Sequence, residues 1–294
     1  MTNEVSDRVI GLIQNKLWIK VSSCETYASL HFNEPSTRNA IGAETAEALA
    51  ELILETKKIN STHPFASLLR QRKLVALFLR SEVPGVFLSG GNLKAITTFT
   101  MEQGRNFTEQ MRVFTEFLRA GPLVSIAVLN GIASGGGSEI ALACDLRVST
   151  GDKVQIDLAQ ARWGVPAGWG MMSDLRLKAV FGSERRRGIA IASQETWELE
   201  KLETLGLIDA RFEKLPDQEH QFLNWASKLI QKLSICPADL RTELIIERPQ
   251  SKDASLAEFD KTLFSRYWMG DEHLGRLNGF LAERRASKQK DEHS

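Results

Sequence analysis

The sequence predicts an α/β protein with a largely parallel sheet, followed by a helical C-terminal segment. Short apolar runs typical of buried strands alternate with longer segments in which apolar residues recur at helical spacing. This alternation indicates β-α-β units, whose strands pair in parallel. After about residue 218 only helical patterns remain. We therefore expect an α/β core over residues 1–215 and a helical segment over residues 216–294.

The first predicted elements are two strands, a helix and a third strand. The runs LWIKV (17–21) and ASLHF (28–32) are typical of short strands joined by a polar turn. A helix is expected over 40–59, where apolar residues face acids and lysines on the opposite side. The continuous apolar run LVALFL (74–79) predicts a parallel strand covered on both faces. The Pro- and Gly-rich stretch after it predicts a loop that leads to another helix.

The clearest helical pattern covers residues 101–120, where large apolar residues share one face and a Gly-Pro pair follows. The other predicted elements are a strand at 123–128, a helix at 138–145, strand-like runs at 146–150 and 153–157, and helices at 220–233, 254–269 and 272–287.

Charge balance and cysteine content narrow the classes of function. The 37 basic and 37 acidic residues give a formal net charge of zero, which argues against nucleic-acid or membrane-surface partners. The longest apolar region, 123–144, contains glycines and Glu139, which predicts a buried α/β segment rather than a membrane span. The 3 cysteines lack metal-ligand spacing, and the 5 histidines form no recognisable triad or metal site, so we expect reduced thiols and no metal. The N-terminal residues lack an apolar leader core, and we expect a cytoplasmic protein.

Glycine-rich corners follow two of the predicted strands. One strand leads through SGGNLK (89–94) to a helix, and another leads through NGIASGGG (130–137) to a helix. A helix N-terminus offers unpaired N–H groups, and glycine lets a ligand approach them without a Cβ in the way. Two such corners side by side could present two N–H donors to one oxygen, as an oxyanion hole does. Alternatively, the glycines only permit close packing of the helix on the strand. A phosphate-binding loop is not indicated, because neither of the glycine spacings typical of such loops is present.

Glu139 directly follows the second corner. A carboxylate that points into a ligand pocket can serve as a general acid or base. The alternative is an acid that the helix dipole favours in the first turn.

The two corners resemble the signature segments of the crotonase superfamily, the enoyl-CoA hydratase/isomerase family. SGGNLK resembles that family's small-small-Gly-x-Asp-Leu-Lys loop, with Asn92 in place of the usual Asp. NGIASGGGSEIALACDLRVS resembles its Gly-Gly-Gly-x-Glu-Leu-Ala-x-x-Cys-Asp helix start almost residue for residue. The likeness covers nearly the whole chain, through SLHFNEPSTRNAIG, WGVPAGWG, KLETLGLIDA and EHLGRLNGFLAERR.

The resemblance implies a spiral of repeated β-β-α units, with a C-terminal helical segment that helps to build a homotrimer or a dimer of trimers. It implies an acyl-CoA thioester substrate, with coenzyme A as part of the substrate and no other cofactor. The carbonyl would accept N–H bonds from Gly91 and Gly136, with Glu139 as acid or base. Arg38 would face the CoA phosphates; the alternative is a solvated surface arginine with no role in binding. The other expected substrate contacts are Ser89, Gly90, Asn92, Leu93, Lys94, Gly135, Trp163, Pro166 and Trp169; for the two tryptophans, core packing is the alternative.

The chain departs from the hydratase pattern at the second catalytic glutamate. That residue stands seven positions before the Pro of a turn, and counting back from Pro166 gives Ala159, which cannot transfer a proton. Asp157 lies two residues away, on the same face of a strand, and could compensate; residue 160 is Gln. Three activities therefore remain open: a hydratase, isomerase or lyase that uses Glu139 alone, a decarboxylase of malonyl-type CoA esters, or a non-catalytic CoA-binding protein. VPAGWG resembles the Pro-Ser-Trp-Gly run of ethylmalonyl-CoA decarboxylase-like members.

Overall fold

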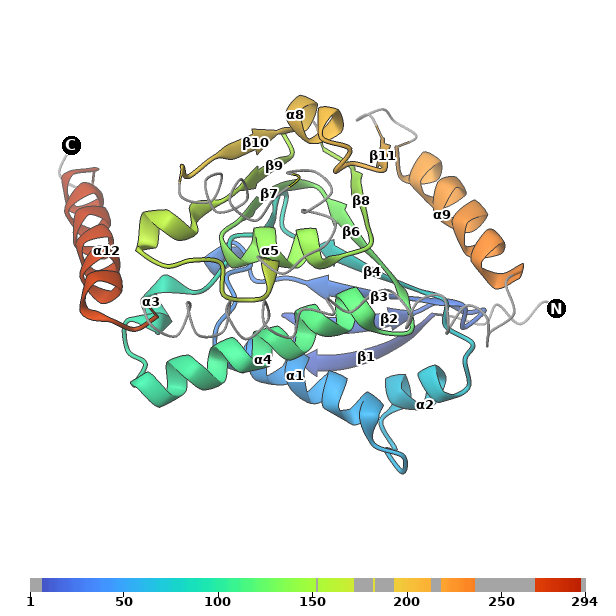
Figure 1. Ribbon diagram of the computed structural model, residues 1–294. Helices are drawn as coiled ribbons and strands as arrows, with labels where there is room; N and C mark the ends of the chain where they lie inside the picture. Colours follow the sequence, from blue (N-terminus) through green and yellow to red (C-terminus); the bar gives the residue numbers. More distant parts are fainter. Residues whose placement is uncertain are drawn as a thin grey trace.

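Two sheets form the centre of the protein in a computed structural model that describes residues 7–151, 153–171, 182, 193–212, 218–235 and 268–291. The larger is a 7-stranded sheet with the order β1-β2-β3-β4-β6-β8-β11, and the smaller is a 4-stranded sheet with the order β10-β9-β7-β5 (Figure 1). The strands of the larger sheet are β1 (Arg8–Ile13), β2 (Leu17–Val21), β3 (Tyr27–Phe32), β4 (Ala76–Ser81), β6 (Val124–Leu129), β8 (Leu146–Ser149) and β11 (Ala210–Arg211). Those of the smaller sheet are β5 (Gly85–Leu88), β7 (Gly131–Ser134), β9 (Gln155–Asp157) and β10 (Thr196–Glu198).

The helices surround these sheets. They are α1 (Ala43–Lys57), α2 (Pro64–Arg70), α3 (Leu93–Ile96), α4 (Met101–Ala120), α5 (Gly136–Ala143), α8 (Leu199–Thr204), α9 (Gln218–Ile235) and α12 (Asp271–Asp291), with the 3₁₀ turns η1 (Pro35–Thr37) and η2 (Ala159–Trp163).

A β-β-α unit repeats along the chain. β4 and β5 precede α3 and α4, and β6 and β7 precede α5. In each unit the first strand joins the larger sheet and the second joins the smaller one, and neighbouring units pair in parallel. The predicted α/β spiral is thereby confirmed. The expectation of plain loops after the strands at 74–79 and 123–128 was wrong, because those stretches contain β5 and β7.

The larger sheet is covered on both faces, as the continuous apolar runs predict. Along β4, Leu77 and Leu79 belong to the core beneath α1 and α4, whereas Phe78 belongs to a second cluster with Phe222 of α9. Side chains that alternate across a strand reach opposite faces of the sheet, so a fully buried strand must be apolar at every position.

Helix α4 begins and ends as its sequence predicts. Thr100 and Gln103 form a reciprocal capping box at its start, and Gly121 stands at its C-terminal cap. Its apolar stripe is buried, and this stripe includes Phe107 and Phe114. Such a cap contributes about 0.5–2 kcal/mol to helix stability.

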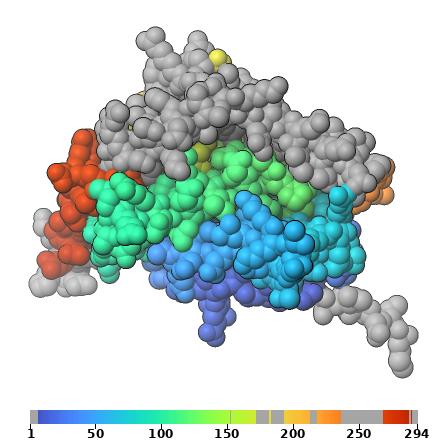
Figure 2. Space-filling view, turned by 60° about the horizontal axis from the view of Figure 1, so that its bottom comes forward, coloured from blue at the N-terminus to red at the C-terminus, as the bar shows by residue number. Residues whose placement is uncertain are grey.

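The C-terminal part supplies α9 and α12, as predicted for 220–233 and 272–287. The predicted helix at 254–269 lies outside the described residues except for Trp268 and Met269, and so does the proposed boundary at 215/216. Figure 1 shows α12 at the side of the molecule near α3, and Figure 2 shows its red surface against the teal-green segment around residue 100. Within the described part of the chain, every helix is too short or too polar to cross a membrane.

Candidate active site

The two glycine-rich corners lie side by side. β5 and β7 are parallel neighbours, with Val86 opposite Ile132, so the loops that follow them leave the same edge of the smaller sheet. Gly90 has a φ of +95°, and a Cβ on it would lie 2.7 Å from the Ser134 carbonyl oxygen and 3.2 Å from the Gly136 nitrogen. Only glycine permits both this conformation and this approach. The backbone of one corner therefore lies directly against the backbone of the other.

In each corner, one backbone N–H group is not used in the hydrogen bonds that hold the corner itself. The Gly90 carbonyl accepts a 2.7 Å bond from the Ile41 N–H. Because a trans peptide points its C=O and N–H in opposite directions, the Gly91 N–H faces away from Ile41. Gly136 is the first residue of α5, and the first N–H groups of a helix have no partner within it.

Two glycines of the second corner, Gly136 and Gly137, also permit close packing. A Cβ on Gly136 would overlap the Trp169 ring, and one on Gly137 would overlap the Leu88 carbonyl. The packing explanation and the ligand explanation of the triple glycine are therefore compatible, because the corner is both tight and exposed to a cavity.

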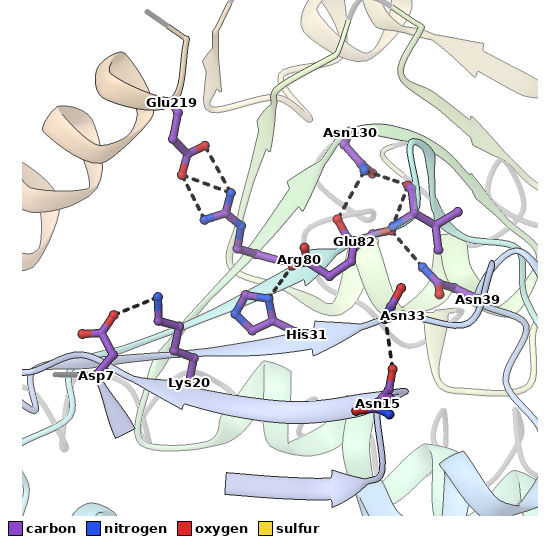
Figure 3. A network of polar contacts seen from close by, with 12 residues as sticks. Asp7, Asn15, Lys20, His31, Asn33, Asn39, Arg80, Glu82, Asn130 and Glu219 are labelled. Atoms are coloured by element: carbon purple, nitrogen blue, oxygen red, sulfur yellow. Dashed lines mark hydrogen bonds and ion pairs between the residues drawn. The ribbon is translucent and has the colours of Figure 1, made fainter. Parts of the chain in front are cut away.

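Two amide side chains, the buried Asn39 and the half-buried Asn130, fix the turn that leads into the first corner (Figure 3). Asn39 donates from Nδ2 to the Ser81 hydroxyl at 2.8 Å and to the Phe87 carbonyl at 3.1 Å. Asn130 donates to the Val83 carbonyl at 3.0 Å. The Asn39 bonds tie β5 to the end of β4, and the Asn130 bond holds the turn that precedes β5, so that the corner after β5 has a rigid base.

A cavity of about 100 Å³ opens in front of the two corners. Ten of the predicted site residues line it: Ser89, Gly90, Gly91, Leu93, Gly135, Gly136, Glu139, Trp163, Pro166 and Trp169. Its lining also includes residues for which we had no expectation: Ile96, Phe107, Ser134, Val165, Trp268 and His273. Most of these side chains are apolar, as is typical of a small-molecule site with a few placed polar groups.

Arg38, Asn92 and Lys94 are not among the residues that line the cavity. Arg38 and Lys94 are exposed, and the Ser89 hydroxyl links the turn before Arg38 to the first corner through the Thr37 carbonyl at 3.2 Å. Asn92 is the N-cap of α3, and its side chain accepts the Ala95 N–H at 3.2 Å. Asn and Asp cap helices equally well, so the departure from the expected Asp preserves this local role.

Glu139 is the buried acid of the cavity. Its side chain accepts backbone N–H bonds from Trp169 at 2.7 Å and from Gly168 at 3.1 Å, and only 3% of the residue is exposed. Gln160 and Met171 lie farther away, each at 3.4 Å. Burial raises the pKa of the Glu139 carboxyl, while these hydrogen bonds act in the opposite direction.

The segment 157–160 does not supply a second carboxylate to the cavity. Asp157 accepts the Ser134 hydroxyl at 2.7 Å and pairs with Arg162 at 3.4 Å, and it is not a lining residue. The idea that it compensates for Ala159 is therefore not supported by its position. Ala159 is buried in η2, and the residue of this turn that faces Glu139 is its neighbour Gln160.

Residues of α12 and of the turn before it form part of the cavity wall. His273 of α12 contacts the Trp163 carbonyl at 2.7 Å through Nδ1, and Trp268 donates to the Gly104 carbonyl at 2.8 Å. Phe280 packs edge-on against the Trp163 ring, with ring centroids 5.0 Å apart. Within the described residues, no group of three or more His, Cys, Asp or Glu side chains could hold a metal ion.

The fold and the site together define a class: a two-sheet spiral protein in which two glycine-rich corners and one buried acid line a small, mostly apolar cavity. The sequence profile described as Enoyl-CoA hydratase/isomerase matches residues 24–291. The chain belongs to this enoyl-CoA hydratase/isomerase family, and thus to the crotonase superfamily.

Known relatives agree with this assignment. The human enoyl-CoA hydratase domain-containing protein 2, mitochondrial, is 33% identical over 138 residues, which cover 47% of this chain and 43% of that protein. The human methylglutaconyl-CoA hydratase, mitochondrial, is 29% identical over 192 residues, 60% of this chain and 55% of that protein. The aligned parts thus span less than two thirds of these relatives. The crystal structure of human mitochondrial delta3-delta2-enoyl-CoA isomerase has the same fold, with a TM-score of 0.72 at 18% identity over 93% of this chain and 99% of that one.

Proposed function

We propose that this protein is an acyl-CoA-processing enzyme that stabilises a thioester enolate between the backbone N–H groups of Gly91 and Gly136. The observation that supports the proposal is the contact of the two corners at Gly90, together with the presence of both Gly91 and Gly136 in the lining of the cavity. Donors fixed in advance around a developing oxyanion are usually the largest single contribution to such catalysis. The hydratase and isomerase names of the relatives support the same class of substrate.

Glu139 is the proposed acid or base at the α-carbon of the acyl group. Its carboxyl lines the same cavity as the two corners, and the backbone N–H groups of Gly168 and Trp169 hold its orientation. The raised pKa keeps this carboxyl protonated to a higher pH than an exposed glutamate, so it can give a proton to carbon as well as take one.

The outer end of the site suits the charged part of coenzyme A. Arg38 and Lys94 are both exposed and lie on the two segments that Ser89 ties together. Their positive charges would face the CoA phosphates, while the acyl group enters the apolar cavity. The homotrimer or dimer of trimers and the cytoplasmic location are further proposals, which light scattering and cell fractionation would test.

A decarboxylase of malonyl-type CoA esters is the second candidate. It is favoured by the neutral Gln160 at the wall where a hydratase would use a second carboxylate. Loss of CO₂ generates the enolate without a base, so such a reaction needs the two N–H groups more than it needs an acid pair.

The test is to measure acyl-CoA binding by calorimetry and the exchange of α-protons of butyryl-CoA in D₂O by NMR. We expect the wild-type protein to bind the thioester and to exchange its α-protons, and Glu139→Ala to bind it without exchange. CO₂ release from methylmalonyl-CoA would select the second candidate. Absence of acyl-CoA binding would refute the proposed function as a whole.

A further inference from the structure

Two side chains that line the cavity each carry a buried polar atom with no hydrogen-bond partner among the residues that the structure describes. The atoms are Oε1 of Gln160 and Nε2 of His273. Both side chains are almost fully buried, with 4% of Gln160 and 2% of His273 exposed. An unpaired buried polar atom costs about 1–3 kcal/mol, so such atoms in a native cavity indicate a ligand group that pairs with them.

The hydrogen bonds around these side chains define both atoms as acceptors. A carbonyl can only accept, so Nδ1 of His273 carries the proton that it shares with the Trp163 carbonyl at 2.7 Å. Nε2 of the neutral ring is then a bare acceptor, and burial favours this state by lowering the pKa of His273. Gln160 donates from Nε2 to the Gly135 carbonyl at 3.0 Å, which leaves its Oε1 as the free acceptor.

Several contacts hold His273 in one orientation. The Trp163 carbonyl fixes its tautomer, and its ring lies 4.9 Å from the Trp268 ring. Trp268 is itself anchored to the Gly104 carbonyl. A base that a third group orients in this way is the usual arrangement for proton transfer.

We propose that His273 is the second proton-transfer group of the site and takes the proton of a water molecule that adds to an enoyl thioester. This inference rests on the proposed function and names its reaction as hydration of a 2-enoyl-CoA. A water that donates one hydrogen to His273 Nε2 and the other to Gln160 Oε1 keeps a lone pair for attack on the β-carbon. The two proton-transfer roles of a two-glutamate hydratase are then filled by Glu139 and by the imidazole of His273 in α12.

The proton count closes without any further reactant. As the water oxygen forms its bond to the β-carbon, one O–H bond breaks and that proton passes to His273. The electron pair of the C=C bond moves toward the thioester oxygen, where Gly91 and Gly136 donate their N–H groups. The α-carbon then takes the proton of the Glu139 carboxyl. Return of the proton from the imidazolium to the Glu139 carboxylate through solvent restores the starting state.

The experiment separates hydration from α-proton exchange. His273→Asn keeps a side-chain donor near the Trp163 carbonyl but lacks the acceptor at Nε2. We expect it to lower kcat for crotonyl-CoA hydration by about 100-fold or more, while exchange of butyryl-CoA α-protons stays within about threefold of wild type. Added imidazole should restore hydration by His273→Ala, because the truncated side chain leaves room for it. His31→Asn is the matched control at a buried histidine that does not line the cavity, and it should hydrate at the wild-type rate.

Three results would overturn the role of His273. The first is hydration by His273→Asn at the wild-type rate, and the second is an equal loss of α-proton exchange and hydration in His273→Asn. The third is a wild-type protein that exchanges α-protons but does not hydrate crotonyl-CoA. In each of these the proposed function stands. If His273→Asn does not fold, His273→Gln and the imidazole rescue give the same comparison. Failure of the wild-type protein to bind acyl-CoA or to exchange α-protons is a different outcome, which refutes the proposed function.

Discussion

Gly90→Ala tests the contact between the two corners. Gly90 combines a φ of +95° with a close approach, since an added Cβ would lie 2.7 Å from the Ser134 carbonyl oxygen. Both neighbouring atoms, the Ser134 oxygen and the Gly136 nitrogen, belong to the backbone and cannot swing aside as a flexible side chain would. The substitution must therefore move one corner relative to the other.

The expected magnitude follows from two costs. A non-glycine residue at such a φ is strained by about 1–3 kcal/mol, and overpacking of a tight site adds about 1–3 kcal/mol. The sum of about 2–6 kcal/mol lies within the stability of a typical domain, so the variant should still fold. To restore an ordinary contact of 3.4 Å, the Ser134 oxygen must retreat by about 0.7 Å, and a misplacement near 1 Å can cost about 100-fold in rate.

The assay pairs thermal unfolding with turnover measured well below the melting temperature. Gly90→Ala should lower Tm by about 4 °C or more and kcat for α-proton exchange by about 10- to 100-fold, with a smaller change in acyl-CoA affinity. Gly11→Ala is the control, because a Cβ there meets nothing within 4 Å. It should leave both quantities unchanged. A Gly90→Ala protein with wild-type Tm and turnover would refute the proposed packing of the corners.

Three further predictions concern the acid, the helix cap and the buried histidines. Glu139→Gln should abolish α-proton exchange and destabilise the fold by about 1–3 kcal/mol, because the NH₂ group of Gln must face a backbone N–H that now donates to a carboxylate oxygen. Chemical denaturation measures the loss of stability, and a variant as stable as the wild type would contradict this prediction. Asn92→Ala should cost about 0.5–2 kcal/mol through loss of the cap on Ala95, whereas Asn92→Asp should be nearly neutral; equal effects in denaturant titrations would exclude a capping role. Burial lowers the pKa of His31 and of His273, so the folded protein binds these protons less readily than the unfolded chain, and stability should fall as pH drops below the ordinary imidazole value of 6.5. Urea midpoints at about pH 5 and about pH 7.5 should show this decline, and His31→Asn should weaken it; a pH-independent midpoint would contradict the assignment.

The main elements of the fold could be predicted because their patterns are local. The apolar stripe of α4 and the continuous apolar runs of β4 and β6 need no knowledge of distant residues. β5 and β7 could not be recognised in the same way, since each is a 4-residue strand with glycine at its start. What makes them strands is their pairing with each other, which only the assembled spiral provides.

The glycine corners and Glu139 could be predicted because their chemistry is concentrated in two short segments. The role of the segment near Pro166 was harder to predict, because counting positions pointed to Ala159 while the 3₁₀ turn brings Gln160 to the cavity. His273 had no local signal at all. It lies in a highly charged helix, and its importance depends on the carbonyl of Trp163, more than a hundred positions away in the sequence.

The contribution of α12 to the cavity wall has a consequence for the order in which the protein matures. During synthesis the glycine corners and Glu139 leave the ribosome long before Trp268 and His273 do. Because the strands of both sheets precede α12 in the chain, they are all synthesised while the cavity still lacks one wall. In a nascent or C-terminally clipped chain, the cavity would then be open to bulk solvent on that side. Synthesis of α12 would be the step that completes the wall of the cavity.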